Sequence, residues 1–161
     1  MGLLDIIKTR PAQSDMSDGF WKVVYANGKA VIPTLARLGV AWLTIEPIDV
    51  VDWGDKARFW AKVVERIRAG NPRAKAPKDL NLPSPVARAA GFKSERAFEE
   101  KARGWAIERR SGTYRVIPYK RRKDKGWEED DAKAVELPVG ASEERVAAEL
   151  IDVIKSTIGE V

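Results

Sequence analysis

Hydrophobic positions in the first third of the chain fall in short runs broken by turn residues. Two such runs, residues 21–26 and 29–32, flank Asn27 and Gly28. An Asn-Gly pair between β-prone runs predicts a hairpin, because the type I′ turn needs a positive φ at both central residues. Residues 40–45 predict a further buried strand, which ends before Pro47.

Helical spacing appears after residue 55 and again near the end of the chain. Apolar residues between positions 60 and 67 recur at i, i+3, i+4 and i+7, so we predict a helix capped by Asp55 and running to about residue 69. Arg66 and other basic residues of this helix are expected mostly on its outer side. Ser142 begins a second predicted helix, which runs to about residue 158 and covers one face of a sheet.

Between these helices the pattern predicts two short helices and three strands. Ser84 and Ser94 suit the caps of helices that end near residues 90 and 103. A charged loop is expected over residues 120–131. The strands are expected to form a meander over 106–110, 113–118 and 133–137.

Together these elements indicate an α+β fold, in which hairpins build an antiparallel sheet and helices pack on it. A chain of 161 residues suits one domain, so we expect a single domain over residues 1–161. Residues 9–19 are expected to be a loop, and the Pro- and Lys-rich residues 71–83 a connector.

Composition narrows the chemistry, because the chain contains no Cys and no His. Disulfides, zinc sites built on thiolate or imidazole, Cys nucleophiles and His-containing triads are therefore excluded. Four carboxylates recur every three residues from Glu46 to Asp55, but Asp52 and Asp55 are suited to capping the next helix. No nucleophile elbow, phosphate loop or dinucleotide motif is present either. We expect a protein that is not an enzyme and that needs no metal or cofactor.

The net charge of +5 is unevenly distributed along the chain. Residues 56–125 hold 21 basic and 7 acidic side chains, whereas residues 126–161 hold 3 basic and 10 acidic ones. Two interpretations remain open. The acidic end could pair with the basic middle inside the fold, or one of them could form a charged docking face for a protein or a nucleic acid.

The densest basic stretch carries two interleaved tyrosines, Tyr114 and Tyr119. Basic groups neutralise phosphates and aromatic rings stack on bases, so a nucleic-acid-binding hairpin is one interpretation. Because alternate residues of a strand face opposite sides, a solvated hairpin is the other. The candidate nucleic-acid-binding residues are Arg109, Arg110, Arg115, Lys120, Arg121 and Arg122.

The helix pair over residues 85–103 could add to such a surface. Residues 85–98 resemble the second helix-turn-helix of AraC-type regulators in their Ala, Gly-Phe, Ser and Phe positions. That family surrounds the motif with helices, whereas strands are expected here. The alternative is a tight helical corner whose core residues are Val86, Ala90, Phe92 and Phe98.

An acidic cluster follows Trp127. A group of carboxylates can take the place of nucleic-acid phosphates on a basic partner, with the tryptophan as an anchor. The alternatives are a solvated loop and a metal site, although the calcium-loop pattern is absent. The candidate partner-binding residues are Trp127, Glu128, Glu129, Asp130 and Asp131.

The last third of the chain carries a family resemblance. It runs from Tyr114–Tyr119 through a polar loop to a strand ending in Leu137 and Pro138, and then to the Ser-Glu-Glu start of a helix at residue 142. This order resembles the immunity proteins of bacterial contact-dependent growth inhibition systems, and residues 82–106 are similar too. The resemblance covers roughly residues 82–158. It implies a small cytoplasmic protein that binds and blocks a toxin domain delivered by a neighbouring cell. Many such toxins are nucleases.

The first hypothesis is therefore a toxin-neutralising immunity protein, and a nucleic-acid-binding module is the alternative. Residues 1–8 are apolar but too short for a signal peptide and interrupted by an acidic residue, and no apolar run approaches the roughly 20 residues of a membrane span. We expect a cytoplasmic protein without membrane contact, whose partner is the cognate toxin domain.

Overall fold

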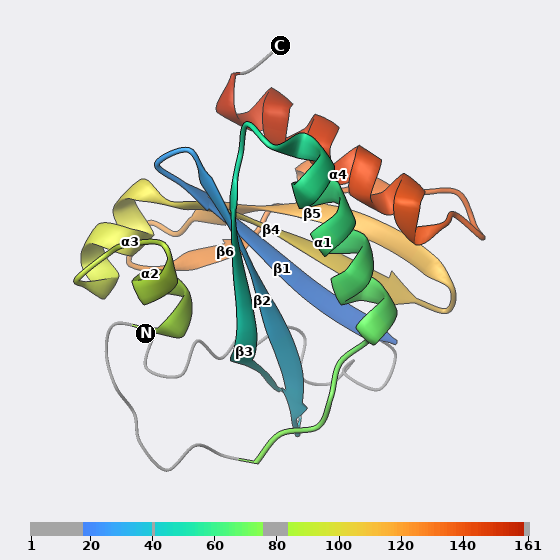
Figure 1. Ribbon diagram of the computed structural model, residues 1–161, viewed down its shortest axis with the longest axis horizontal. Coiled ribbons are helices and arrows are strands. Elements are labelled where there is room, and N and C mark those ends of the chain that lie inside the picture. The colour runs from blue at the N-terminus through green and yellow to red at the C-terminus, as the bar shows by residue number, and fades with distance from the viewer. Residues whose placement is uncertain (1–17, 40, 76–83, 160–161) are drawn as a thin grey trace.

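The computed structural model describes residues 18–39, 41–75 and 84–159 and contains a seven-stranded antiparallel sheet (Figure 1). Strand order is β3-β2-β1-β4-β5-β6, and β7 also pairs with β5. The strands are β1 (Gly19–Ala26), β2 (Lys29–Leu38), β3 (Ala41–Asp52), β4 (Arg103–Arg110), β5 (Thr113–Arg121), β6 (Trp127–Glu129) and β7 (Val135–Glu136). The α-helices of the described residues are α1 (Lys56–Ala69), α2 (Pro85–Ala89), α3 (Glu95–Lys101) and α4 (Glu143–Ile158). The predicted α+β class is confirmed.

Both predicted hairpins are present. Asn27 and Gly28 have φ values of 53° and 74°, and Ser111 and Gly112 have 50° and 78°. These positive φ values are the ones that a type I′ turn requires. The predicted helix caps are also confirmed, because Asp55, Ser84, Ser94 and Ser142 each accept a hydrogen bond from the backbone N–H three residues on. The predicted loop and connector fall mostly outside the described residues.

Strand β3 differs from its prediction, because it continues through Pro47 to Asp52. Residue 40, the predicted first residue, lies outside the described residues. Pro47 is tolerated because β3 is an edge strand and because the register with β2 shifts between Ile32 and Thr34. The Thr34 hydroxyl donates to the Pro47 carbonyl at 2.9 Å and so replaces part of the interrupted ladder.

The predicted charged loop over residues 120–131 was also wrong. Strand β5 continues to Arg121, and β6 pairs with it in the register Arg121–Trp127 and Lys120–Glu128. A 3-10 turn, Asp131–Lys133, then leads to β7, which is shorter than the strand predicted there. Helix α3 ends two residues before its predicted end, because the chain enters β4 at Arg103.

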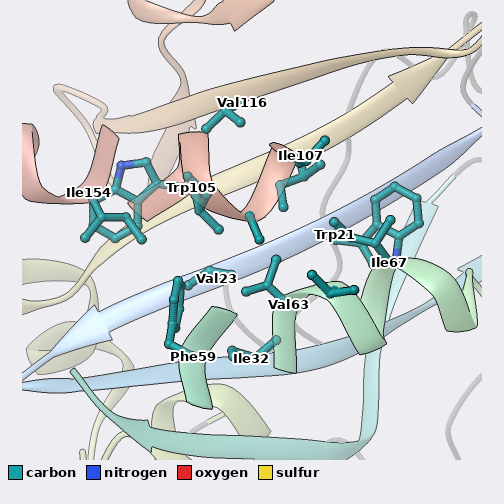
Figure 2. Packing of buried hydrophobic residues seen from close by; sticks show 14 of the residues in the cluster. Trp21, Val23, Ile32, Phe59, Val63, Ile67, Trp105, Ile107, Val116 and Ile154 are labelled. Carbon is teal, nitrogen blue, oxygen red and sulfur yellow. The ribbon is translucent and has the colours of Figure 1, made fainter. Parts of the chain in front are cut away.

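Helices α1 and α4 lie side by side over one face of the sheet and enclose the larger core (Figure 1). Figure 2 shows Phe59, Val63 and Ile67 of α1 against Ile32 and the central strands. Ile154 of α4 contributes to the same cluster. Phe59 is fully buried and lies outside the apolar stripe predicted from residues 60–67.

The opposite face of β1 and β2 packs against α2 and α3. Val24, Ala26 and Val31 form one cluster with residues of the helix pair. The predicted corner is confirmed, since its four core residues are at most 9% exposed: Val86, Ala90, Phe92 and Phe98. The helix pair is therefore part of the fold's interior on this face.

Arg66 corrects another expectation, because its side chain is only 6% exposed. It forms an ion pair with Asp49 of β3, and Lys62 lies 3.8 Å from the same carboxylate. An arginine on the inner side of α1 is stabilised there because a carboxylate from the sheet edge neutralises it. The helical pattern could not reveal this burial, because Asp49, which neutralises Arg66, lies 17 residues away in the sequence.

Arg68 joins α1 to the start of α4. Its Nε lies 3.3 Å from Glu143 Oε1, and its Nη2 forms an ion pair with Glu144. The Trp60 indole donates to the Glu144 carbonyl at 3.2 Å. The backbone N–H of Glu144, and then the Arg68 guanidinium, lower the pKa of the Glu144 carboxyl below its ordinary range.

This geometry predicts an acid-dependent contribution to stability. A depressed carboxyl pKa stabilises the fold above the unfolded pKa of about 4.3, and the contribution is lost as the pH falls through the folded value. We expect Glu144→Gln to lower the free energy of unfolding at pH 7, and the difference from the wild type to shrink between about pH 4.5 and pH 3. Denaturant unfolding at a series of pH values measures it. Glu149→Gln on the same helix is the control, and an equal pH-dependent loss in both variants would contradict the assignment.

Candidate partner-binding surface

Strand β6 is held to the body of the protein by Trp127. The indole ring packs 5.4 Å from the ring of Phe98 and 6.1 Å from that of Tyr119, measured between centroids. Its Nε1 donates to the Glu99 carbonyl at 3.1 Å, and Lys22 Nζ lies 5.6 Å from the ring centroid. Trp127 is half-buried and therefore anchors the acidic segment to its own chain.

The four acidic residues after Trp127 differ in exposure. Glu128 and Asp131 are exposed, Glu129 is half-buried, and Asp130 is only 8% exposed. Glu128 lies opposite Lys120 of β5, whereas Asp131 forms an ion pair with Arg115 at 3.2 Å. Because residues 115 and 120 of one strand face opposite sides, Glu128 and Asp131 lie on the two sides of the sheet edge. We call Glu128 and Asp131 the acidic edge.

Gly104 provides the space that Trp127 occupies, and this contact was not predicted from the sequence. A Cβ on Gly104 would lie 2.6 Å from Trp127 Cζ3 and 3.2 Å from Tyr119 Cδ2. A glycine in the middle of a strand often marks such a close approach, but its partner 23 residues later could not be identified from sequence.

The candidate nucleic-acid-binding residues do not form one surface. Arg109 packs over Trp21, at 5.4 Å from the ring centroid, on the face that α4 covers. Arg110 and Arg115 instead hold Glu108, at 2.9 and 3.5 Å, on the other side of the sheet. Glu108 is only 3% exposed, so these two guanidinium groups neutralise a buried carboxylate.

The other three candidates lie at the far end of β5. Arg121 donates to the carbonyls of Glu99 and Glu100, which end helix α3 and attract a positive group. Arg122 forms an ion pair with Asp124 at 3.1 Å. Lys120 is exposed. The basic middle of the chain is thus largely paired within the fold.

Arginines and lysines differ in their side-chain partners along residues 84–133. Every arginine there has an interaction with another group. The lysine side chains of the same stretch form no hydrogen bond or ion pair with the described residues, and they are Lys93, Lys101, Lys120, Lys123, Lys125 and Lys133. An arginine fork suits fixed bidentate contacts, whereas an exposed lysine remains free for a partner.

The carboxylates that recur from Glu46 to Asp55 are engaged separately. Asp49 pairs with Arg66, and Asp55 caps α1 as predicted. Asp52 does not cap a helix but forms an ion pair with Lys29 at 3.3 Å. Among the described residues, no group of three or more acidic side chains could hold a metal ion. None of the helices described is long and apolar enough to cross a membrane.

The contact between Gly104 and Trp127 gives a stability prediction. Gly104→Ala forces the indole or β4 to move, so we expect the free energy of unfolding to fall by about 1–3 kcal/mol. Gly54→Ala is the control, since a Cβ there meets no atom within 4 Å and the residue does not have a positive φ. Its effect should stay within about 0.5 kcal/mol. Urea unfolding followed by tryptophan fluorescence measures both, and equal effects would contradict the proposed contact.

The fold is similar to two solved structures. No protein family model and no curated protein matches the chain. A protein of unknown function from Neisseria meningitidis is 18% identical, with a TM-score of 0.59 over 84% of this chain and 92% of that one. A chain of the CdiA-CT/CdiI toxin and immunity complex from Yersinia pseudotuberculosis is 15% identical, with a TM-score of 0.57 over 94% of this chain and 99% of that one. At these identities the likeness shows a shared fold, and that fold occurs in a toxin and immunity complex.

Proposed function

We propose that the chain is an immunity protein that binds a cognate toxin domain and blocks it. The observation that carries this proposal is the likeness in fold to a chain of a toxin and immunity complex, over 94% of this chain and 99% of that one. A likeness over nearly the whole of both chains supports a similar role. The resemblance of residues 82–158 to immunity proteins of growth inhibition systems points the same way.

The acidic edge is the proposed contact with the toxin. Glu128 and Asp131 are exposed on the two sides of β6, which is the last strand of the sheet. A partner that binds on both sides of this edge can place basic groups against both carboxylates. Complementary charge then fixes the orientation of the complex. A nuclease toxin suits this contact, because its substrate-binding surface must be basic to hold phosphates. Trp127 contributes by fixing the position of β6 rather than by inserting into the partner.

The protein is further proposed to act by binding alone, in the cytoplasm of the cell that it protects. The side chains first considered for acid-base chemistry are occupied by ion pairs or caps, as at Asp49, Asp52 and Asp55. The nucleic-acid alternative receives less support, because five of its six candidate residues already interact within the fold.

Co-expression tests this proposal. The toxin domain encoded by the gene immediately upstream is expressed in host cells with and without this chain, and growth and co-purification are followed. We expect arrested growth with the toxin alone, and restored growth and a stable complex when both are present. Growth that this chain does not restore would contradict the immunity function.

Charge reversal tests the acidic edge separately. Glu128→Lys with Asp131→Lys should weaken the complex by about 2–5 kcal/mol, because buried interfacial charges would meet like charges. Asp152→Lys with Glu149→Lys, on the outer part of α4, makes the same change in net charge and should leave affinity nearly unchanged. Titration calorimetry on the purified pair measures both. Equal affinity for wild type and edge variant would exclude the acidic edge, whether or not the toxin is neutralised.

A further inference from the structure

Two adjoining hollows lie at the end of the sheet where β4 begins and α4 ends. One, of about 230 Å³, is lined by residues that include Trp105, Lys120 and Trp127. The other, of about 400 Å³, is lined by Tyr25, Lys101, Ile158 and Gly159. Arg103 lines both. We call the pair the basic hollow.

The polar groups of the basic hollow are mainly hydrogen-bond donors. Four basic residues line it, and no carboxylate side chain of the described residues does so: Lys101, Arg103, Lys120 and Arg121. A third hollow, beside α3, differs in this respect, because Glu99, Glu100 and Asp124 line it together with basic residues. Among the residues that the structure describes, the lining of the basic hollow therefore carries a net positive charge.

Its lysines and Arg103 differ in how firmly their side chains are held. Arg103 Nη1 donates to the Thr157 carbonyl at 3.0 Å, so the guanidinium is fixed at the end of α4. Lys101 and Lys120 are exposed and have no side-chain partner among the described residues. A fixed guanidinium between two free ammonium groups suits a ligand with several negative charges.

Trp105 offers a spectroscopic marker for this site. The residue is 1% exposed and lines the smaller hollow, and its indole N–H has no hydrogen-bond partner in the described part of the chain. Because this nitrogen is itself buried, a ligand in the hollow does not reach it, and the indole serves as a nearby reporter rather than as a contact. The apolar surface of Trp127 and Ile158 beside it suits the hydrocarbon part of a side chain.

We propose that the basic hollow is a second docking site, which takes an acidic peptide segment of the partner protein. This inference rests on the proposed function, and it adds a negatively charged element to the partner's contact surface. A peptide fits better than a nucleic acid, because the positive charge is confined to this end of the sheet. The arginines that would extend it along β4 and β5 hold Glu108 on the other face. With Glu128 opposite Lys120, negative and positive docking groups meet at one corner and orient the partner.

Binding of a fluorescein-labelled peptide of eight glutamates to the full chain tests the site by fluorescence anisotropy. We expect Lys101→Glu with Lys120→Glu to weaken binding at least tenfold. The control pair, Lys93→Glu with Lys123→Glu, makes the same charge change at exposed lysines outside both hollows and should stay within twofold of wild type. Equal weakening in the two pairs, or no measurable binding to wild type, would overturn the proposal.

The indole N–H signals in nitrogen-15 NMR spectra locate the peptide. Trp21 and Trp105 both have buried indole N–H groups without a partner among the described residues, but only Trp105 lines the hollow. We expect the Trp105 signal to move on titration and the Trp21 signal to stay. If eight-residue oligothymidylate binds more tightly than the peptide through the same lysines, the site serves nucleic acid and the proposal fails. If inorganic phosphate at the peptide's concentration produces the same shift, the hollow holds a free anion and the proposal also fails.

Failure here and failure of the immunity function are distinguishable. The peptide titration needs no toxin, and co-expression needs no peptide. A wild-type chain that restores growth but does not bind the peptide keeps its proposed function and loses only the second docking site. In the purified complex, Lys101→Glu with Lys120→Glu should also weaken toxin binding more than the control pair does.

Discussion

Strand β1 has no face toward solvent, and the rest of the structure depends on that constraint. Trp21 and Val23 point into the core beneath α1 and α4, whereas Phe20 and Val24 point to the opposite side. Even the charged residue between them, Lys22, is only 6% exposed and lies over the Trp127 ring. A central strand of this kind requires cover on both faces. The remaining chain supplies it with one long helix pair, one short pair and the ring of Trp127.

Features fixed by neighbouring residues could be predicted from sequence. The two turns depend on positive φ at adjacent residues, and each cap depends on a backbone N–H three positions away. Features that depend on a distant partner could not. Pro47 lies within a strand because of a register shift in β2, and Arg66 is buried because Asp49 neutralises it. The same holds for the candidate site. Its acidic residues could be identified from the sequence. Their placement on two sides of the sheet edge could not, because β6 forms only through pairing with β5.

The sequence left two interpretations of the charge pattern open, internal pairing and a charged docking face, and the structure has features of both. Arginines of the basic middle join segments of the fold: Arg68 holds the start of α4, while Arg103 and Arg121 donate to the carbonyls at the ends of α4 and α3. This is internal pairing. The lysines of residues 84–133 and two of the acidic residues after Trp127, Glu128 and Asp131, are exposed at the surface. Net charge alone therefore describes the binding properties of this protein poorly.

The contact between Trp127 and Gly104 belongs to the packing of the fold, whereas the proposed contact with a partner is made by other residues. The ring and the glycine fill one space, so a change at either position requires a change at the other. Residues 128 and 131 carry exposed side chains outside that space, so their substitution does not change the seating of the ring. Such an arrangement allows the charge of the edge to follow a changing partner while the scaffold stays constant. In a set of related chains, positions 104 and 127 should vary together, and positions 128 and 131 should vary with the partner's sequence instead.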